Sequence, residues 1–441
     1  MSLFGAIHTA ISGLGAQSTS FGNISEDVAN SQTVGFKRVD TSFIDYLTTS
    51  TATQNEPGSV VATPDYVNNV QGTITQTDNP LGMAIAGQGF FAVSQATDVV
   101  NNVPTFNPQQ FYTRAGDFTM NAGGYLVNSA GNYLNGWSVN PTTNVVNQNG
   151  LAPIQVSQST YNPVATSNVT LAANLPATPA SGTATATSPL ASDITVYDSL
   201  GTAHTVTLNW TQNAANDWTV QVNAPGNTDV GSADVQFGKT ASGNPVPDGT
   251  IGQITASPTD TGTVTTGGYV AGQPATLNIT ANFGSGPQTI NLNLGDYGGT
   301  SGVTQFAGST YSLLGLTQNG IPPGSFTGVT TQANGNVVVN YNNGQSRTIA
   351  QIPIVTFNAP DSLQSQNGES FTATPASGTP LAETANTSGA GNIVTGSVEG
   401  SNVDIATEFS TLIVAQQAYS ANAKVVTTAN QMLQATLQMI A

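Results

Sequence analysis

The C-terminal stretch, residues 401–441, restricts the fold of this chain more than any other. It contains no proline and no glycine, so nothing in it interrupts a helix. Apolar or aromatic residues recur there at every seventh position, namely Ile405, Leu412, Tyr419, Val426, Leu433 and Ile440. A second row lies four residues after the first five of these and comprises Phe409, Gln416, Ala423, Asn430 and Leu437. This heptad pattern predicts one helix, about 55 Å long, whose narrow apolar stripe packs against another helix.

A matching pattern occupies the N-terminus. Its first row comprises Ile7, Leu14, Phe21 and Val28, and its second row comprises Leu3, Ala10, Gln17 and Ile24. Four glycines in the same stretch each weaken a helix by about 1 kcal/mol relative to alanine, so this helix would be marginal alone. The two patterns therefore predict terminal helices that pair and supercoil with a partner. An ordinary terminal helix packed on its own domain is the alternative.

Capping residues indicate where these helices begin and end. Ser2 is the predicted N-cap of the first helix, and Asn30, Ser31 and Gly35 end its pattern. Ser401, with Asp404 three residues later, predicts the start of the last helix, with a carboxylate near the positive end of the helix dipole.

Between the two helices the sequence is typical of β-structure in more than one domain. A chain of 441 residues is too long for one core. After a connecting segment at residues 30–75, with a short helix or extended arm at 41–48 and a loop at 49–63, strands are expected on both sides of glycine-rich and asparagine-rich turns. The predicted strand regions are Met83–Gln95, Phe111–Trp137, the hairpin Ile194–Trp210, Trp218–Val222, Ala275–Ala281, Thr289–Leu294, Asn336–Tyr341 and Ile349–Phe357.

The charge balance excludes several kinds of partner. Charged residues make up only 7% of the chain, and 6 basic against 23 acidic residues leave a net charge of −17. Such a chain is a poor ligand for nucleic acid or an anionic membrane surface. The absence of cysteine excludes disulfides, thiol chemistry and cysteine metal sites. No run approaches the roughly 18 apolar residues of a membrane span.

The first residues lack the pattern of a cleaved secretory signal. Residues 1–8 (MSLFGAIH) have neither a basic n-region nor a clear apolar h-region. If the protein functions outside the cell, we expect export by a route that needs no cleaved signal peptide.

Residues for catalysis or metal binding are sparse. The histidines, His8 and His204, are far apart and have no metal-type spacing. Acidic residues of the middle region, Asp193 to Asp296, stand mostly beside Gly, Ser or Asn, where aspartate caps turns. A pair of them could still serve a polysaccharide-cleaving enzyme, since such enzymes use two carboxylates. The prediction is no catalytic, cofactor or metal site.

Three groups of residues form distinctive motifs along the chain. The first is Ala29–Lys37 (ANSQTVGFK), directly after the N-terminal pattern. The second combines Ala84–Val93, Tyr112–Phe118 (YTRAGDF) and Gly124–Val127. The third combines Gly396–Asp404 (GSVEGSNVD) and Ala415–Asn422 (AQQAYSAN). In this order they resemble the rod and hook axial proteins of the bacterial flagellum, and together they cover roughly half of the chain. The length, the middle insertion and Val196–Gly201 (VYDSLG) favour hook members over the shorter rod members.

The resemblance implies a mixed fold with a coiled-coil-like core of paired terminal helices and two all-β domains, the outer inserted into the inner. The corresponding division is 1–29 with 402–441 for the helical core, 30–75 for the connection, 76–156 with 324–401 for the inner β domain and 157–323 for the outer. The implied function is structural: a flexible tubular joint that transmits torque from rod to filament. The predicted contact residues of the polymer are Leu3, Ile7, Leu14, Phe21, Val28, Ile405, Phe409, Leu412, Tyr419, Val426, Leu433 and Leu437.

The resemblance further implies a homopolymer without a cofactor. Its expected partners are the flagellar rod, the hook cap, the hook–filament junction proteins and the flagellar export apparatus, with neither nucleic acid nor membrane. The expected location is extracellular, in the hook of the flagellum. A distal rod component and a secreted β-rich adhesin that binds carbohydrate remain as alternatives.

Overall fold

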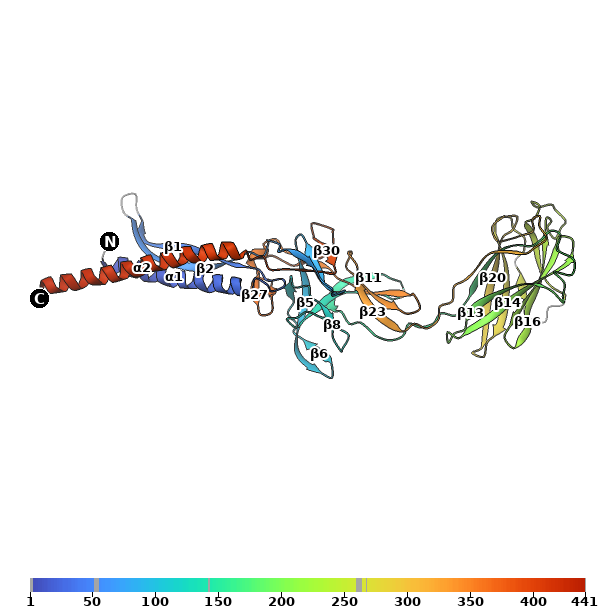
Figure 1. Ribbon diagram of the computed structural model, residues 1–441, viewed down its shortest axis with the longest axis horizontal. Coiled ribbons are helices and arrows are strands. Elements are labelled where there is room, and N and C mark those ends of the chain that lie inside the picture. Colours follow the sequence, from blue (N-terminus) through green and yellow to red (C-terminus); the bar gives the residue numbers. More distant parts are fainter. Residues whose placement is uncertain (1–2, 51–54, 142, 259–263, 267, 441) are drawn as a thin grey trace. The chain divides into compact units, whose positions relative to one another are not determined.

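The computed structural model describes residues 3–50, 55–141, 143–258, 264–266 and 268–440. The chain is rich in β-strands and carries one helix near each end, α1 (Leu3–Ala29) and α2 (Ile405–Ile440) (Figure 1). It divides into two compact units. Unit 1 comprises Met1–Gln158, Thr327–Asn340 and Ser346–Ala441, and unit 2 comprises Ser159–Phe326 and Tyr341–Gln345.

The C-terminal helix has its N-cap at Asp404, three residues after the Ser401 start that the sequence predicts. Asp404 Oδ1 accepts hydrogen bonds from the backbone N–H groups of Ala406 (2.9 Å) and Thr407 (3.2 Å), so Asp404 is the N-cap. Ser401 Oγ instead accepts from Val403 N in the preceding turn. The helix has 36 residues, about 54 Å at 1.5 Å per residue, which agrees with the predicted length. Ser2 lies outside the described residues.

The connecting segment holds a long β-hairpin where a loop was predicted. Strands β1 (Val39–Ser50) and β2 (Asn55–Tyr66) pair antiparallel, with Phe43 opposite Ala62. The prediction of a loop at 49–63 was wrong for the residues of this stretch that the structure describes. It treated serine, threonine and glycine as loop residues, but threonine favours strands, and pairing and packing decide whether a strand forms. The hairpin lies on α1 (Figure 1) and supplies that packing.

Hydrogen bonds attach this hairpin to α1. Val60 N donates to Ser12 Oγ (3.0 Å), and Asn23 Nδ2 donates to Thr41 Oγ1 (2.9 Å). The Thr9 hydroxyl lies 3.1 Å from the carbonyl oxygens of both Gly5 and Gly58. Short polar side chains on one face of α1 therefore serve as partners for the hairpin backbone.

The rest of unit 1 is built on one large sheet with the main strand order β23-β24-β25-β10-β5-β7-β28-β27. Two separate two-stranded sheets pair early strands of the chain with late ones, β3 with β31 and β4 with β30. The strands are β3 (Ile74–Gln76), β4 (Met83–Ala86), β5 (Phe90–Val100), β6 (Val103–Phe106), β7 (Phe111–Thr113), β8 (Thr119–Met120), β9 (Leu126–Val127), β10 (Asn132–Val139), β11 (Val146–Pro153), β23 (Phe326–Thr331), β24 (Asn336–Tyr341), β25 (Ser346–Gln351), β26 (Ile354–Thr356), β27 (Gln364–Gln366), β28 (Ser370–Thr372), β29 (Leu381–Glu383), β30 (Asn392–Thr395) and β31 (Ser397–Glu399), with the short helix η1 (Pro360–Ser362).

Most strand predictions in this unit are confirmed. Residues 121–124 form the turn between β8 and β9, and residues 342–344 form the turn between β24 and β25. The predicted single strand Ile349–Phe357 was wrong in one respect: it is divided between β25 and β26 around Pro353, which has no N–H to donate to a sheet. An aromatic cluster that includes Phe90, Phe357 and Phe371 packs beneath these strands.

Unit 2 consists of two sheets that share one core. One sheet has the order β18-β19-β20-β12-β21, with β22 beside β12, and the other runs β13-β14-β15-β16-β17. The predicted hairpin Ile194–Trp210 is confirmed as β13 paired with β14. Alternate residues point inward, and Trp210 and Trp218 are completely buried in the core. The strands are β12 (Asn168–Asn174), β13 (Leu190–Tyr197), β14 (Ala203–Ala214), β15 (Asp217–Ala224), β16 (Asn227–Phe237), β17 (Ile251–Ala256), β18 (Val264–Thr266), β19 (Pro274–Asn282), β20 (Pro287–Asp296), β21 (Val303–Thr304) and β22 (Ser312–Gln318).

Candidate polymer contact surface

The two terminal helices lie side by side in unit 1, as their matching patterns predict (Figure 1). They run antiparallel: Gly13 of α1 meets Asn422 of α2, whereas Phe21, further along α1, meets the earlier Tyr419. The rings of Phe21 and Tyr419 pack edge to face, with centroids 6.2 Å apart. A Cβ at Gly13 would lie 2.9 Å from Asn422 Nδ2, so the helices approach closely where α1 has no side chain.

The side of α2 that faces α1 differs from the second row that the sequence predicts. Glu408, Ala415 and Ala429 are buried, and Asn422 is half-buried. The predicted second row lies one position further along and is exposed at Phe409, Gln416 and Asn430. After Glu408, the inner row carries only alanine and asparagine side chains, because the close approach at Gly13 leaves no room for large ones.

Most predicted contact residues are only partly covered within the chain. Half-buried residues are Ile7, Leu14, Phe21, Val28, Leu412, Val426 and Leu433. The side chains of Ile405, Phe409 and Tyr419 are 42%, 52% and 42% exposed. The side chains of Leu3 and Leu437 lie outside the described part of the structure. These two helices thus present large apolar surface to solvent, which in proteins marks interaction sites.

Further exposed apolar residues escaped the sequence analysis. They are Phe4, Ile11, Ile413, Val414, Val425 and Met432. Phe4 and Ile11 are seven residues apart, as are Val425 and Met432, so this further heptad spacing beside the two predicted rows was the signal that could have identified them.

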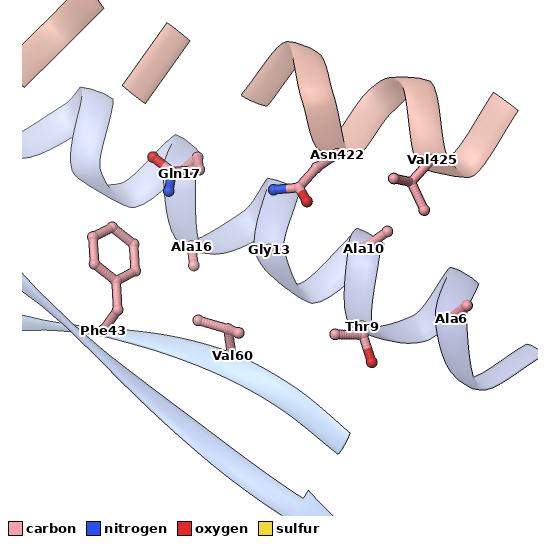
Figure 2. Close-up of a pocket in the computed structure, with 10 residues that line it drawn as sticks. All are labelled: Ala6, Thr9, Ala10, Gly13, Ala16, Gln17, Phe43, Val60, Asn422 and Val425. Carbon is pink, nitrogen blue, oxygen red and sulfur yellow. The ribbon is translucent and has the colours of Figure 1, made fainter. Parts of the chain in front are cut away.

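A groove opens between the two helices and the hairpin (Figure 2). Its volume is about 430 Å³. The lining residues are Ala6, Thr9, Ala10, Gly13, Ala16 and Gln17 from α1, Phe43 from β1, Val60 from β2, and Asn422 and Val425 from α2. None of them is charged, and the small side chains of α1 form its floor.

A buried ionic cluster lies where the terminal segments meet the large sheet. Glu399 Oε1 accepts from Lys37 Nζ (2.5 Å) and Gly72 N (2.9 Å), and Glu399 Oε2 accepts from Arg114 Nη1 (2.9 Å). Arg114 also donates to the carbonyl oxygens of Ile85 (3.1 Å) and Gly87 (2.7 Å). The three charged residues come from the three groups of motifs that the sequence analysis singled out, so these motifs are neighbours in space.

Burial shifts the titration of this cluster. It lowers the pKa of the Lys37 ammonium and of the Arg114 guanidinium, while the adjacent Glu399 carboxylate opposes both shifts. Glu399 is completely buried, and the two basic residues are almost completely buried. Because an unpaired buried charge is strongly destabilising, the fold requires these three residues to pair.

A pair of acidic residues lies between the helices at the end nearest this cluster. Asp27, in the last turn of α1, and Glu408, in the first turn of α2, are 1% and 3% exposed. Burial, with the negative charges of Glu408, Asp40 and Glu26, raises the pKa of Asp27 to about 7, against the effect of its hydrogen bond from Val39 N. Burial and the negative charge of Asp40 also raise the pKa of Glu408.

The two histidines belong to different units of the structure. His8 is exposed on α1. His204 Nε2 lies 3.1 Å from Asp198 Oδ2, and Asp198 also accepts from Leu200 N and Thr202 N, which closes the turn between β13 and β14. Among the described residues, no group of His, Asp and Glu is arranged to hold a metal ion. No helix in the described ranges is long and apolar enough to cross a membrane.

Comparisons with known protein families match three parts of the chain, all to flagellar hook and basal body proteins. Residues 84–174 match the flagellar hook protein FlgE/F/G D1 domain, residues 165–321 match the flagellar basal body protein FlaE D2 domain, and residues 394–439 match the flagellar basal body rod FlgEFG protein C-terminal family.

Relatives match along almost the whole chain. The flagellar hook protein FlgE of Brucella abortus is 31% identical over 98% of both chains. That of Escherichia coli K12 is 30% identical over 97% of this chain and 98% of its own. The crystal structure of Helicobacter pylori flagellar hook protein FlgE2 is 15% identical, with a TM-score of 0.45 over 72% of this chain and 98% of that chain.

Proposed function

The chain belongs to the flagellar hook protein family, and from that membership we propose that its copies polymerise through α1, α2 and the hairpin β1–β2. As a member of a structural family, it is a subunit of the flagellar hook and not an enzyme. Full-length similarity to hook proteins distinguishes it from the shorter rod proteins and from an adhesin.

The exposed apolar side chains of the two helices carry this proposal. Phe4 and Ile11 on α1, with Phe409, Ile413 and Met432 on α2, are more than half exposed. Burial of such a side chain from the fully exposed state contributes roughly 1.5–3 kcal/mol, and each of these has more than half of its surface still to bury against another copy. The proposed contact set combines these exposed side chains with the set that the heptad rows predict, from Leu3 to Val28 and from Ile405 to Leu437.

We assign different mechanical roles to the regions of the chain. The proposed division is 1–29 with 402–441 as the polymer core, 30–75 as the connection, 76–156 with 324–401 as an inner β domain, and 157–323 as an outer domain inserted into it. The core and the inner domain carry torque, while outer domains slide past one another as the tube bends. The low charge of the chain supports sliding, because few ion pairs would hold one register.

The proposed partners follow from membership of the family. They are the flagellar rod, the hook cap, the hook–filament junction proteins and the flagellar export apparatus, through which we propose that the subunit leaves the cell. Copies add head to tail in a lattice that does not close, as a tube requires.

Electron microscopy of flagellar basal bodies tests the proposal directly. Deletion of the gene is expected to leave rods that end without a hook, and the wild-type gene is expected to restore hooks. Incomplete rods would move the protein to the rod. Intact hooks and filaments in the deletion strain would contradict a role in the hook.

A further inference from the structure

We propose that the groove between α1, α2 and the hairpin receives Phe409 and Ile413 from α2 of a second copy. This inference rests on the proposed function, because it presupposes that copies assemble through their terminal helices. It adds the site and the side chains of one particular contact.

The construction of the groove favours an apolar occupant. Ala6 and Ala10 leave a hollow on α1 beside Gly13, where Asn422 approaches, and Val60 and Val425 stand on either side of it (Figure 2). The groove has no charged residue, and the Thr9 hydroxyl already lies 3.1 Å from two backbone carbonyl oxygens. Large apolar side chains would fill this volume and recover the dispersion contacts that an open hollow lacks.

The charge of the chain argues for the same kind of contact. Each copy carries a net charge of −17 and only six basic residues, of which Lys37 and Arg114 are buried in the ionic cluster. Contacts between such copies cannot depend on many ion pairs, and removal of apolar surface from water is the main attraction that remains.

Phe409 and Ile413 have the geometry to enter the groove. Both are 52% exposed, while Glu408 and Ala415 occupy the side of α2 that faces α1. They stand four residues apart, as do Ala6 and Ala10 on the floor. Side chains at this spacing form a ridge that fits between the corresponding rows of another helix.

The occupant must come from another copy. Asn422, at the groove, lies about 20 Å along the same continuous helix from Phe409. A ridge and a groove at different points of the helix pair form a heterologous contact, which repeats from copy to copy and gives an open helical assembly when the rotation between copies does not close a ring. That is the contact a tubular polymer needs.

Disulfide trapping tests the inference, because the natural chain has no cysteine. Cells that lack the natural gene would produce two single variants together, Gln17→Cys at the groove and Ile413→Cys on the ridge. Any disulfide between these two variants must join two copies. We expect an oxidised dimer of unlike chains in isolated hooks, and at least tenfold less of it when Ser18→Cys, exposed and outside the groove lining, replaces Gln17→Cys.

Filling the groove supplies a second measurement. Ala6→Phe occupies the hollow from within and is expected to reduce hook yield several-fold. Ser242→Phe, in an exposed turn of unit 2, adds a bulkier side chain outside the terminal helices and is expected to leave the yield near that of the natural chain. Hooks that form normally without the disulfide between the Gln17→Cys and Ile413→Cys variants overturn this inference and leave the proposed function intact. A chain that never polymerises overturns both.

Discussion

The buried Glu399 carboxylate pairs with two positively charged side chains of the same chain. Lys37 and Arg114 reach it from segments 362 and 285 residues away in the sequence. Gly35 N also donates to the Glu399 backbone carbonyl oxygen (2.8 Å), so side chain and backbone hold the same three segments together. Within unit 1, this residue connects the end of α1, the large sheet and the strand that leads to α2.

We expect Glu399→Gln to destabilise the chain by about 3–5 kcal/mol, because it leaves two buried cations with no negative partner. Denaturant unfolding of the full chain, followed by circular dichroism, measures the change. Asp78→Asn removes one carboxylate at an exposed position and should change stability by less than about 0.5 kcal/mol. Equal effects of the two substitutions would contradict the importance of the cluster.

Substitution by alanine at two glycines of the N-terminal region is expected to change the stability of the chain in opposite directions. A Cβ at Gly15 meets no atom within 4 Å, so Gly15→Ala should stabilise α1 by about 0.5–1 kcal/mol through helix propensity. At Gly35 the backbone has φ +74° and a Cβ would lie 2.3 Å from Ala115 N, so Gly35→Ala should destabilise. Thermal unfolding of both variants checks the signs, and a stabilised Gly35→Ala would refute the described turn.

The helix pair combines an apolar contact with a buried acidic one. Asp27 and Glu408 bring two carboxylates to the same end of the α1–α2 interface, where Val39 N donates to Asp27. Arg38 bonds to the nearby Asp40 (3.2 Å). Proton uptake relieves the repulsion between the acidic groups, so the stability of this element depends on pH.

The sign of that dependence follows from the raised pKa of Asp27. A group whose pKa rises from 3.8 to about 7 on folding contributes stability that is complete below the lower value and is lost as pH rises through the higher one. Stability should therefore fall as pH rises from about 4 to about 7. Asp27→Asn keeps an oxygen for Val39 N and should flatten this profile; an unchanged profile would exclude Asp27 as its source.

The first heptad row of α2, which contains Leu412 and Tyr419, is expected to be essential for assembly. Replacing both Leu412 and Tyr419 by Asp would bring two carboxylates toward α1 and the proposed copy interface, where burial of a charge is costly. Cells with this double variant should lack hooks by electron microscopy. Ser410→Asp with Gln417→Asp, both exposed and equally spaced, is the matched control. Normal hooks from the first pair would refute the predicted row.

At the scale of the whole molecule, the two sheets of unit 2 can be removed at a defined point. Val164 and Ile321 exchange two backbone hydrogen bonds of 2.9 Å, so the chain enters and leaves the sheets of unit 2 as adjacent antiparallel segments. Two residues can close such a pair as a tight turn.

We predict that replacing residues 165–320 by Gly-Gly leaves unit 1 folded and able to polymerise. Circular dichroism would check the fold, and electron microscopy of cells with the shortened gene would check the hooks. Removal of β13–β15 alone should instead cause aggregation, because it opens the shared core around Trp210 and Trp218. Loss of structure in unit 1 after the complete excision would contradict its independence.

Local patterns in the sequence determined much of this molecule. Heptad rows predicted both helices, alternating residues and turn motifs predicted most strands, and the terminal motifs indicated the family. These features depend on residues a few positions apart, where the periods of helix and strand leave a direct trace.

Only the tertiary structure decided the remaining features. The hairpin β1–β2 depends on packing against α1, the inner row of α2 depends on the close approach of Gly13 to Asn422, and the ionic cluster depends on segments hundreds of residues apart. A heptad pattern states that a helix has an apolar side, but the size of the side chains on its partner decides which row turns inward. That choice is made by close packing between distant segments, and no local period records it.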